Sequence, residues 1–207
     1  MKILPKLSLH KTIYYSLKYK GVIFVGKGTK VNIARKGRVL FKNRKSSLYL
    51  GVHFSTASGA TLDIFENGRL VVAKSVGIHR GTKIVIKKNA QLNMGAESFI
   101  NENSRVMCSK KITIGNNSSI SWNVNISDTD SHGIYIEKKL INPNAEIHIG
   151  NKVWICANTT ITKGTIIESN CIVGTNSLVV GKRLYSNNIY AGNPLKNIKK
   201  FDEWGEL

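Results

Sequence analysis

The sequence has few cysteines, no long apolar run and a shortage of acidic side chains. Its three cysteines, Cys108, Cys156 and Cys171, show no metal-type spacing, and their number is odd. Unpaired thiols are typical of a reducing compartment rather than of a disulfide-stapled secreted domain. No run reaches the roughly 18 apolar residues of a membrane-spanning helix, and the start lacks the apolar core of a signal peptide. These absences predict a cytoplasmic protein with one domain and no bound metal.

Acidic residues number 12 against 31 lysines and arginines, which gives a formal net charge of +19. The basic residues crowd the N-terminal half. Such a field attracts polyanions, including anionic lipid, acidic glycans and nucleotide cofactors. The sequence contains no helix-turn-helix, RNP or zinc-finger pattern, so nucleic acid is not the expected partner. A solvated basic face without a specific partner is an equal alternative.

Apolar residues recur at every sixth position in the C-terminal part of the chain. They are Ile149, Ile155, Ile161, Ile167, Val173 and Val179. This period fits neither an α-helix nor an ordinary strand. It fits a chain that turns a corner every six residues, so that three faces make one triangular coil. We therefore predict an all-β fold, a parallel β-helix over residues 22–180. Its coils should have about 18 residues and rise about 4.8 Å each, and phase slips upstream indicate loops or bulged corners.

Both ends of such a solenoid need caps. Residues 1–21 form a basic segment, and its apolar stripe at helical spacing consists of Leu7, Ile13, Tyr14 and Leu17. This segment is expected to cap the open end, and peripheral contact with an anionic membrane is the alternative. Residues 181–207 should form the other cap as a strand or helix, with Ile198, Phe201 and Trp204 at helical spacing.

The repeat is interrupted by an excursion loop at residues 127–148, which opens with Asp128, Asp130 and His132. An imidazole can accept a proton near neutral pH, so His132 is a candidate general base. A neighbouring carboxylate can orient such a ring. On spacing alone, an ordinary polar turn is an equally good interpretation.

Six segments resemble the hexapeptide-repeat acyltransferases, and among them the O-acetyltransferases of bacterial surface polysaccharides. They are FINEN (99–103), ITIG (112–115), ISDTDSHGIY (126–135), IGNKVWICANTTITKGTII (149–167), VGTNSLVV (173–180) and YAGNPLK (190–196). The resemblance implies a left-handed β-helix that transfers acetyl directly from acetyl-CoA to a sugar hydroxyl. It also implies a homotrimer with active sites at the subunit seams and no metal.

The resemblance also implies roles for individual residues. His132 would be the general base, oriented by Asp130 first and Asp128 second, and Asn101 would lie near the acceptor and thioester. The implied CoA-binding residues are Trp154, Ala157, Thr175, Lys182, Lys196 and Lys199. Asn101 could equally be an ordinary corner residue, and each lysine could be plain surface charge.

The sequence departs from the family pattern at two positions. Gly133 follows the candidate base where the family has proline, and Cys156 replaces a glycine after the tryptophan. Two other functions remain open at this point. One is N-acetylation of an amino-sugar, and the other is a non-catalytic basic solenoid that binds an anionic polymer or a membrane. The acceptor could be a nucleotide sugar, a lipid-linked repeat unit or a finished polymer.

Overall fold

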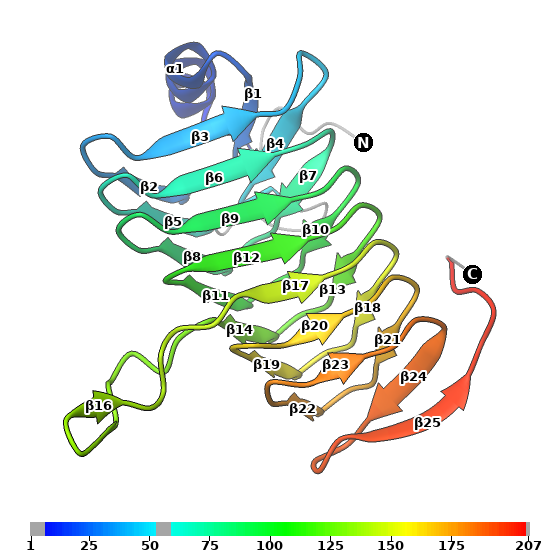
Figure 1. Ribbon diagram of the computed structural model, residues 1–207. Coiled ribbons are helices and arrows are strands. Elements are labelled where there is room, and N and C mark those ends of the chain that lie inside the picture. The colour runs from blue at the N-terminus through cyan, green and yellow to red at the C-terminus, as the bar shows by residue number, and fades with distance from the viewer. Residues whose placement is uncertain (1–6, 53–58, 206–207) are drawn as a thin grey trace.

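The computed structural model describes residues 7–52 and 59–205, so the predicted caps at 1–21 and 181–207 extend beyond the described residues at 1–6 and 206–207. Three sheets of parallel strands form the faces of a left-handed triangular prism, and α1 (Leu9–Tyr19) lies at its N-terminal end (Figure 1). The predicted β-helix is confirmed.

The strands follow one another around the prism in strict rotation. The first face consists of β1 (Val22–Val25), β4 (Ser47–Leu50), β7 (Val76–Ile78), β10 (Phe99–Ile100), β13 (Ser119–Ile120), β18 (Trp154–Ile155), β21 (Ile172–Val173), β24 (Asn188–Ala191) and β25 (Lys196–Lys200). The second face consists of β2 (Lys30–Ile33), β5 (Thr61–Ile64), β8 (Lys83–Ile86), β11 (Arg105–Cys108), β14 (Asn125–Ser127), β19 (Thr160–Thr162) and β22 (Leu178–Val179). The third face consists of β3 (Arg38–Phe41), β6 (Arg69–Val72), β9 (Gln91–Met94), β12 (Lys111–Ile114), β17 (Ile147–Ile149), β20 (Ile166–Ile167) and β23 (Arg183–Leu184). We call the corner between the first and second faces edge 1–2, and the corner between the second and third faces edge 2–3.

The six-residue repeat forms the core of the C-terminal coils. All six of its members, from Ile149 to Val179, have no exposed surface. One apolar side chain from each face therefore points to the prism axis, as the period predicts. The parallel ladders also continue past Val180 through β24, beyond the predicted end of the β-helix.

The coils are wider in the N-terminal half than the expected 18 residues. Thr61 pairs with Lys83, 22 residues later, whereas Trp154 pairs with Ile172, 18 residues later. The wider coils have four-residue strands, most of which bury two alternate side chains instead of one, as in β5, β6, β9 and β11. The upstream phase slips therefore reflect a change of coil width, which corrects the prediction of 18-residue coils throughout.

Asparagines at the corners adopt the left-handed conformation that the turns require. Their φ values lie between 53° and 61° at Asn67, Asn89, Asn103, Asn117, Asn123, Asn158, Asn170, Asn176 and Asn187. Asparagine tolerates this region better than other residues with a β-carbon. Several of these side chains also bond from coil to coil, as where the Asn170 amide donates to Oδ1 of Asn187 at 2.7 Å.

The C-terminal tail is a strand rather than a helix. β25 runs antiparallel to β24 and closes the first face at that end (Figure 1). The helical spacing of Ile198, Phe201 and Trp204 is therefore not realised. Trp204 instead packs beside Trp154, with ring centroids 5.9 Å apart, and donates its indole N–H to the Lys152 carbonyl.

Candidate active site

The excursion leaves edge 2–3 after β14 and returns at β17 (Figure 1). At its tip β15 (Tyr135–Ile136) and β16 (Lys139–Leu140) form an antiparallel hairpin. The two turn residues, Glu137 and Lys138, both have positive φ, as the turns of tight hairpins require. The hairpin side chains are exposed, including several large apolar ones: Ile134, Tyr135, Ile136, Leu140 and Ile141.

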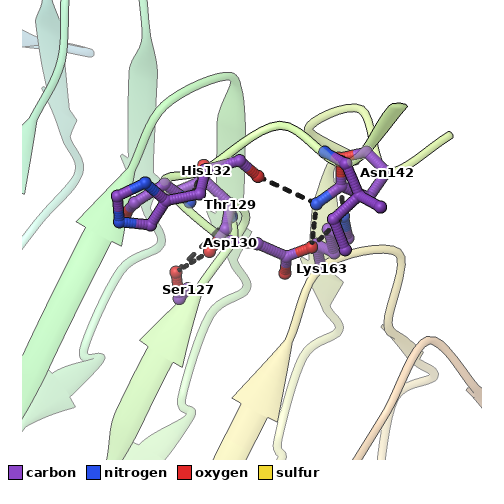
Figure 2. A network of polar contacts seen from close by, with 8 residues as sticks. Ser127, Thr129, Asp130, His132, Asn142 and Lys163 are labelled. Atoms are coloured by element: carbon purple, nitrogen blue, oxygen red, sulfur yellow. Dashed lines mark hydrogen bonds and ion pairs between the residues drawn. The ribbon is translucent and has the colours of Figure 1, made fainter. Parts of the chain in front are cut away.

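His132 lies at the start of this excursion with an exposed imidazole. Its backbone is fixed, because the carbonyl accepts a hydrogen bond of 2.9 Å from Nδ2 of Asn142. Figure 2 shows the ring pointing away from this contact. Within the described residues no hydrogen bond to the ring is recorded, so the imidazole is open to a ligand or to a neighbouring chain.

Asp130 holds the loop rather than the imidazole. Its Oδ2 accepts 2.6 Å and 2.8 Å hydrogen bonds from Nζ of Lys163 and Nδ2 of Asn142 (Figure 2). The hydrogen bond from the Lys163 ammonium, followed by that from Asn142, lowers the pKa of the Asp130 carboxyl. Asp130 is therefore ionised at neutral pH and fastens the loop to the next coil. The expected contact with the His132 ring is not present in this chain.

Asp128 has a buried, structural set of partners. Its carboxylate has no exposed surface and accepts backbone N–H bonds from Ser109 at 2.6 Å and Lys110 at 2.8 Å. Burial raises the pKa of Asp128, and the backbone hydrogen bonds oppose that rise. Asp128 thus supports the corner below the loop, and the structure does not bring its carboxylate to His132 either.

Two residues that the sequence analysis missed hold the candidate base in place. Asn142 joins both limbs of the excursion, because its Oδ1 also accepts the Ile134 N–H at 2.6 Å. Lys163 donates to the Asn142 carbonyl at 2.8 Å as well as to Asp130. Ser127 pairs with Thr162 across adjacent coils, so Lys163 lies one coil from Asp128. Applying the coil register to the sequence could have found this lysine; no comparable signal marks Asn142.

Asn101 lies at edge 1–2, and its amide oxygen has two hydrogen-bond partners. That oxygen accepts the Glu102 N–H at 2.9 Å and lies 3.1 Å from Nδ1 of His79, whose ring stacks on Phe99. No hydrogen bond of the Nδ2 group is recorded among the described residues. The contacts therefore turn the donor side of this amide toward a potential ligand.

Three of the candidate CoA-binding residues, Trp154, Ala157 and Thr175, lie along or beside the edge that carries Asn101. The Thr175 hydroxyl donates a 2.8 Å hydrogen bond to the Ala157 carbonyl. This bond joins the corners of two adjacent coils. Trp154 lies beside them on the first face, 39% exposed, and its indole N–H donates to Oγ of Ser121 at 3.2 Å. Trp122, which the sequence analysis overlooked, is 54% exposed at this edge.

The three candidate lysines do not form one cluster. Lys182 lies at edge 2–3, where its carbonyl accepts the Ile166 N–H. Lys196 and Lys199 lie on β25 at the C-terminal end of the first face, and all three are exposed. The structure thus brings Trp154, Ala157 and Thr175 together and leaves Lys182 on the far edge.

Within one chain the candidate residues form two groups on different edges of the prism. His132, Asp130 and Lys163 lie at edge 2–3, whereas Asn101, Ala157 and Thr175 lie at edge 1–2. The second face separates them, because β19 runs from one edge to the other. At about 3.3 Å per residue this face is roughly 15–20 Å wide. Among the described residues, no group of three His, Cys, Asp or Glu could hold a metal ion.

Comparison with known proteins gives short but clear sequence matches. No protein-family model matches the chain. The putative lipopolysaccharide biosynthesis O-acetyl transferase WbbJ of Escherichia coli (strain K12) is 39% identical over 64 residues, 31% of this chain and 32% of that protein. A probable macrolide acetyltransferase of Lysinibacillus sphaericus is 52% identical over 52 residues, 25% of this chain and 28% of that protein. The match therefore spans about a third of these curated relatives.

Two solved structures match over most of their length. The polysialic acid O-acetyltransferase OatWY has a TM-score of 0.66 and 27% identity, covering 89% of this chain and 87% of its own. The polySia specific acetyltransferase NeuO has a TM-score of 0.58 and 26% identity, covering 86% and 83%. The fold is thus a left-handed β-helix, which is the fold of the hexapeptide-repeat acetyltransferases. Within that class, this chain is similar to the O-acetyltransferases, including NeuO and OatWY.

Proposed function

We propose that the protein is an acetyl-CoA-dependent O-acetyltransferase that acts on a sugar hydroxyl of a bacterial surface polysaccharide or its precursor. The named relatives support this reaction class. The observation that carries the proposal is the geometry at His132, whose carbonyl is held by Asn142 while no hydrogen bond to its imidazole is recorded from residues 7–52 or 59–205. We place the reaction in the cytoplasm, where acetyl-CoA is available.

In this mechanism His132 removes the proton of the sugar hydroxyl while the sugar oxygen attacks the carbonyl carbon of the thioester. The carbon–sulfur bond then breaks, and the imidazolium returns the proton to the departing thiolate. The products are the O-acetyl sugar and free CoA thiol. General-base help of this kind gives about 10²–10⁴-fold in rate. Holding the two substrates together can contribute more, because effective molarities of about 10⁵ M or above are known.

The state of the nearby thiol supports direct transfer rather than an acetyl-cysteine intermediate. Cys156 lies two residues after Trp154, at the candidate CoA edge. Burial raises the pKa of Cys156 to about 11. A cysteine attacks as the thiolate, so this side chain is a poor nucleophile at neutral pH.

Asn101 is suited to act on the thioester or the acceptor. Because Glu102 and His79 occupy its amide oxygen, the Nδ2 group is available as a donor. Such a donor can stabilise the negative charge that develops on the thioester oxygen. This role requires His132 to reach the same substrate from another edge.

A homotrimer would bring the two groups of residues into one site. Within one chain the second face separates edge 1–2 from edge 2–3, so His132 would serve the Asn101 edge of a neighbouring copy. The excursion hairpin supports this arrangement, because its large apolar side chains are exposed in the single chain. Contiguous exposed apolar side chains of this kind mark protein contacts.

In the trimer CoA would lie along edge 1–2. Trp154 would contact the cofactor, and the small residues Ala157 and Thr175 would leave room for the pantetheine arm. The phosphates need cationic partners, for which Lys196, Lys199 and Lys182 are candidates. Because Lys182 lies at edge 2–3, it would act on CoA from the neighbouring copy.

Release of free CoA thiol from acetyl-CoA, measured across a panel of bacterial surface glycans, tests the proposal. The wild type should release thiol with at least one glycan, and His132→Ala should lose well over tenfold in kcat. CoA binding and the sedimentation mass should be unchanged in the variant, because no hydrogen bond from a described residue holds the imidazole. Near-wild-type turnover of His132→Ala would overturn the mechanism, and absence of CoA binding by the wild type would overturn the function.

A further inference from the structure

The N-terminal helix α1 packs on the prism through Tyr15 and Tyr19, which contact the core, and through polar side chains beside them. Thr12 accepts the Val25 N–H at 3.0 Å, and Ser16 bonds both the N–H and the carbonyl of Ile23. Tyr15 donates its hydroxyl to the Val31 carbonyl at 3.3 Å. Hydrogen bonds to the first coil therefore fix which side of the helix faces the solvent.

The opposite side of α1 carries an exposed apolar stripe, which we call the α1 stripe. Its members Leu9, Ile13, Tyr14 and Leu17 are 56%, 59%, 54% and 74% exposed. A surface helix normally buries its apolar side against the core. The predicted stripe is thus real in Ile13, Tyr14 and Leu17, but it faces the solvent. The helix covers the end of the solenoid through Tyr15 and Tyr19 instead. Leu7, which was predicted to belong to the stripe, precedes the helix and is buried.

The α1 stripe lies in a positively charged part of the chain, because the first 62 residues contain no aspartate or glutamate. Asp63 is the first acidic residue, and 13 lysines and arginines precede it. Within residues 7–52 and 59–205, every ion pair involves residues from Glu66 onward. The positive charge of α1 and the first coil is therefore not compensated within the described structure. Lys18 lies beside the stripe, with Nζ 5.4 Å from the Tyr14 ring centroid.

We propose that α1 docks the protein on an anionic lipid surface, with the α1 stripe inserted at the level of the headgroups. The combination of an apolar stripe, a tyrosine and flanking lysines is that of a helix lying in the membrane interface. Each lysine or arginine near an anionic surface adds to the attraction. In the described residues no helix is long and apolar enough to cross a membrane, so α1 lies on the surface. This inference is independent of the acetyl-transfer reaction.

Co-sedimentation of the full chain with lipid vesicles tests the docking. The wild type should pellet with vesicles of equimolar phosphatidylcholine and phosphatidylglycerol, but not with phosphatidylcholine alone. Binding should weaken as salt is raised, because exposed charges are screened over about 10 Å at 0.1 M ionic strength. Absence of pelleting with the anionic vesicles would overturn the proposal.

Two variants separate insertion of the stripe from simple charge attraction. Ile13→Ser/Leu17→Ser keeps the charge and should reduce vesicle binding at least about tenfold, because two large apolar side chains no longer insert. The control Val180→Ser removes another apolar side chain that is 56% exposed and should bind like the wild type. All the replaced side chains are exposed, so the melting temperatures should match.

Equal pelleting of Ile13→Ser/Leu17→Ser and wild type would show that the stripe does not insert. Sedimentation mass without lipid identifies the competing occupant, a second copy of the chain. A mass that falls in Ile13→Ser/Leu17→Ser, but not in Val180→Ser, would show a protein contact and overturn lipid docking.

Discussion

Replacing Asn142 with alanine should lower the catalytic activity while the free energy of unfolding of the domain changes little. The Asn142 side chain accepts the Ile134 N–H at 2.6 Å and donates to the His132 carbonyl at 2.9 Å. Each hydrogen bond of this kind has a net worth of about 0.5–1.5 kcal/mol, so these two together stabilise the loop by about 2 kcal/mol. The third bond of this side chain, from Nδ2 to Oδ2 of Asp130 at 2.8 Å, adds to that value. The loop lies outside the prism, so the free energy of unfolding of the whole domain should change little.

Loss of these bonds allows the excursion to leave the arrangement in which His132 projects. A difference of about 1.4 kcal/mol corresponds to tenfold in a population. Asn142→Ala should therefore lower kcat/KM by about 10- to 100-fold. Hydrogen exchange at the Ile134 amide should accelerate in parallel, which reports on the loop without needing a sugar acceptor.

Two variants sharpen this experiment. Asn116→Ala is the matched control, because that exposed side chain also accepts one backbone bond, the Ala96 N–H at 2.7 Å, far from the loop. Asn142→Asp keeps the acceptor for Ile134 but places a second carboxylate against Asp130, so it should be as impaired as alanine. Turnover of Asn142→Ala within twofold of wild type, with faster exchange at Ile134, would refute the need for a fixed His132 loop.

Three further outcomes are expected. Ile161→Ala removes a fully buried side chain of the six-residue repeat and should lower the free energy of unfolding, measured in urea, by about 2–5 kcal/mol; a loss under about 1 kcal/mol would contradict the packing described. Hydrogen bonds from the Ser186 N–H and from Arg183 lower the pKa of Glu168 below its usual 4.5, so its contribution to stability is present above pH 4.5 and is lost as the pH falls through its folded pKa. The melting temperatures of Glu168→Gln and wild type should thus differ at pH 7 and converge in acid, and a constant difference would argue against this pairing. If the acceptor is an acidic glycan, kcat/KM should fall steeply with salt, and a flat profile would exclude attraction by the basic surface.

The C-terminal coils were predictable because one apolar residue per face repeats without interruption from Ile149 to Val179. The N-terminal coils were predicted as part of the β-helix, but their width was not, because four-residue strands such as β5 bury two side chains, Leu62 and Ile64. The spacing of apolar residues in these coils depends on the number of residues per coil, and a short stretch of sequence does not show that number. The tail shows the same limit: Ile198 has helical spacing, but the unpaired edge of β24 makes a strand the better solution.

The sequence proposes the residues of the candidate site but does not predict their contacts. The break in the repeat marks the excursion, and the residue type marks His132. The sequence ranked Asp130 ahead of Asp128 as the partner of His132, but both carboxylates have other partners: Asp130 pairs with Lys163, and Asp128 accepts backbone N–H groups. These partners come from adjacent coils, 18 to 33 residues away along the chain. These hydrogen-bond partners become neighbours only when the coils stack on one another.

The strand β25 bears on how the molecule avoids growing into fibres. A stack of parallel coils ends in a row of free backbone donors and acceptors, onto which another stack could add end to end. β25 covers that row on the first face, runs in the opposite direction, and is exposed along its whole length with three lysines. A second molecule arriving at this end meets a positively charged antiparallel strand instead of a matching coil. We therefore expect β25 to disfavour end-to-end addition at this end of the prism, whatever part its lysines have in binding CoA.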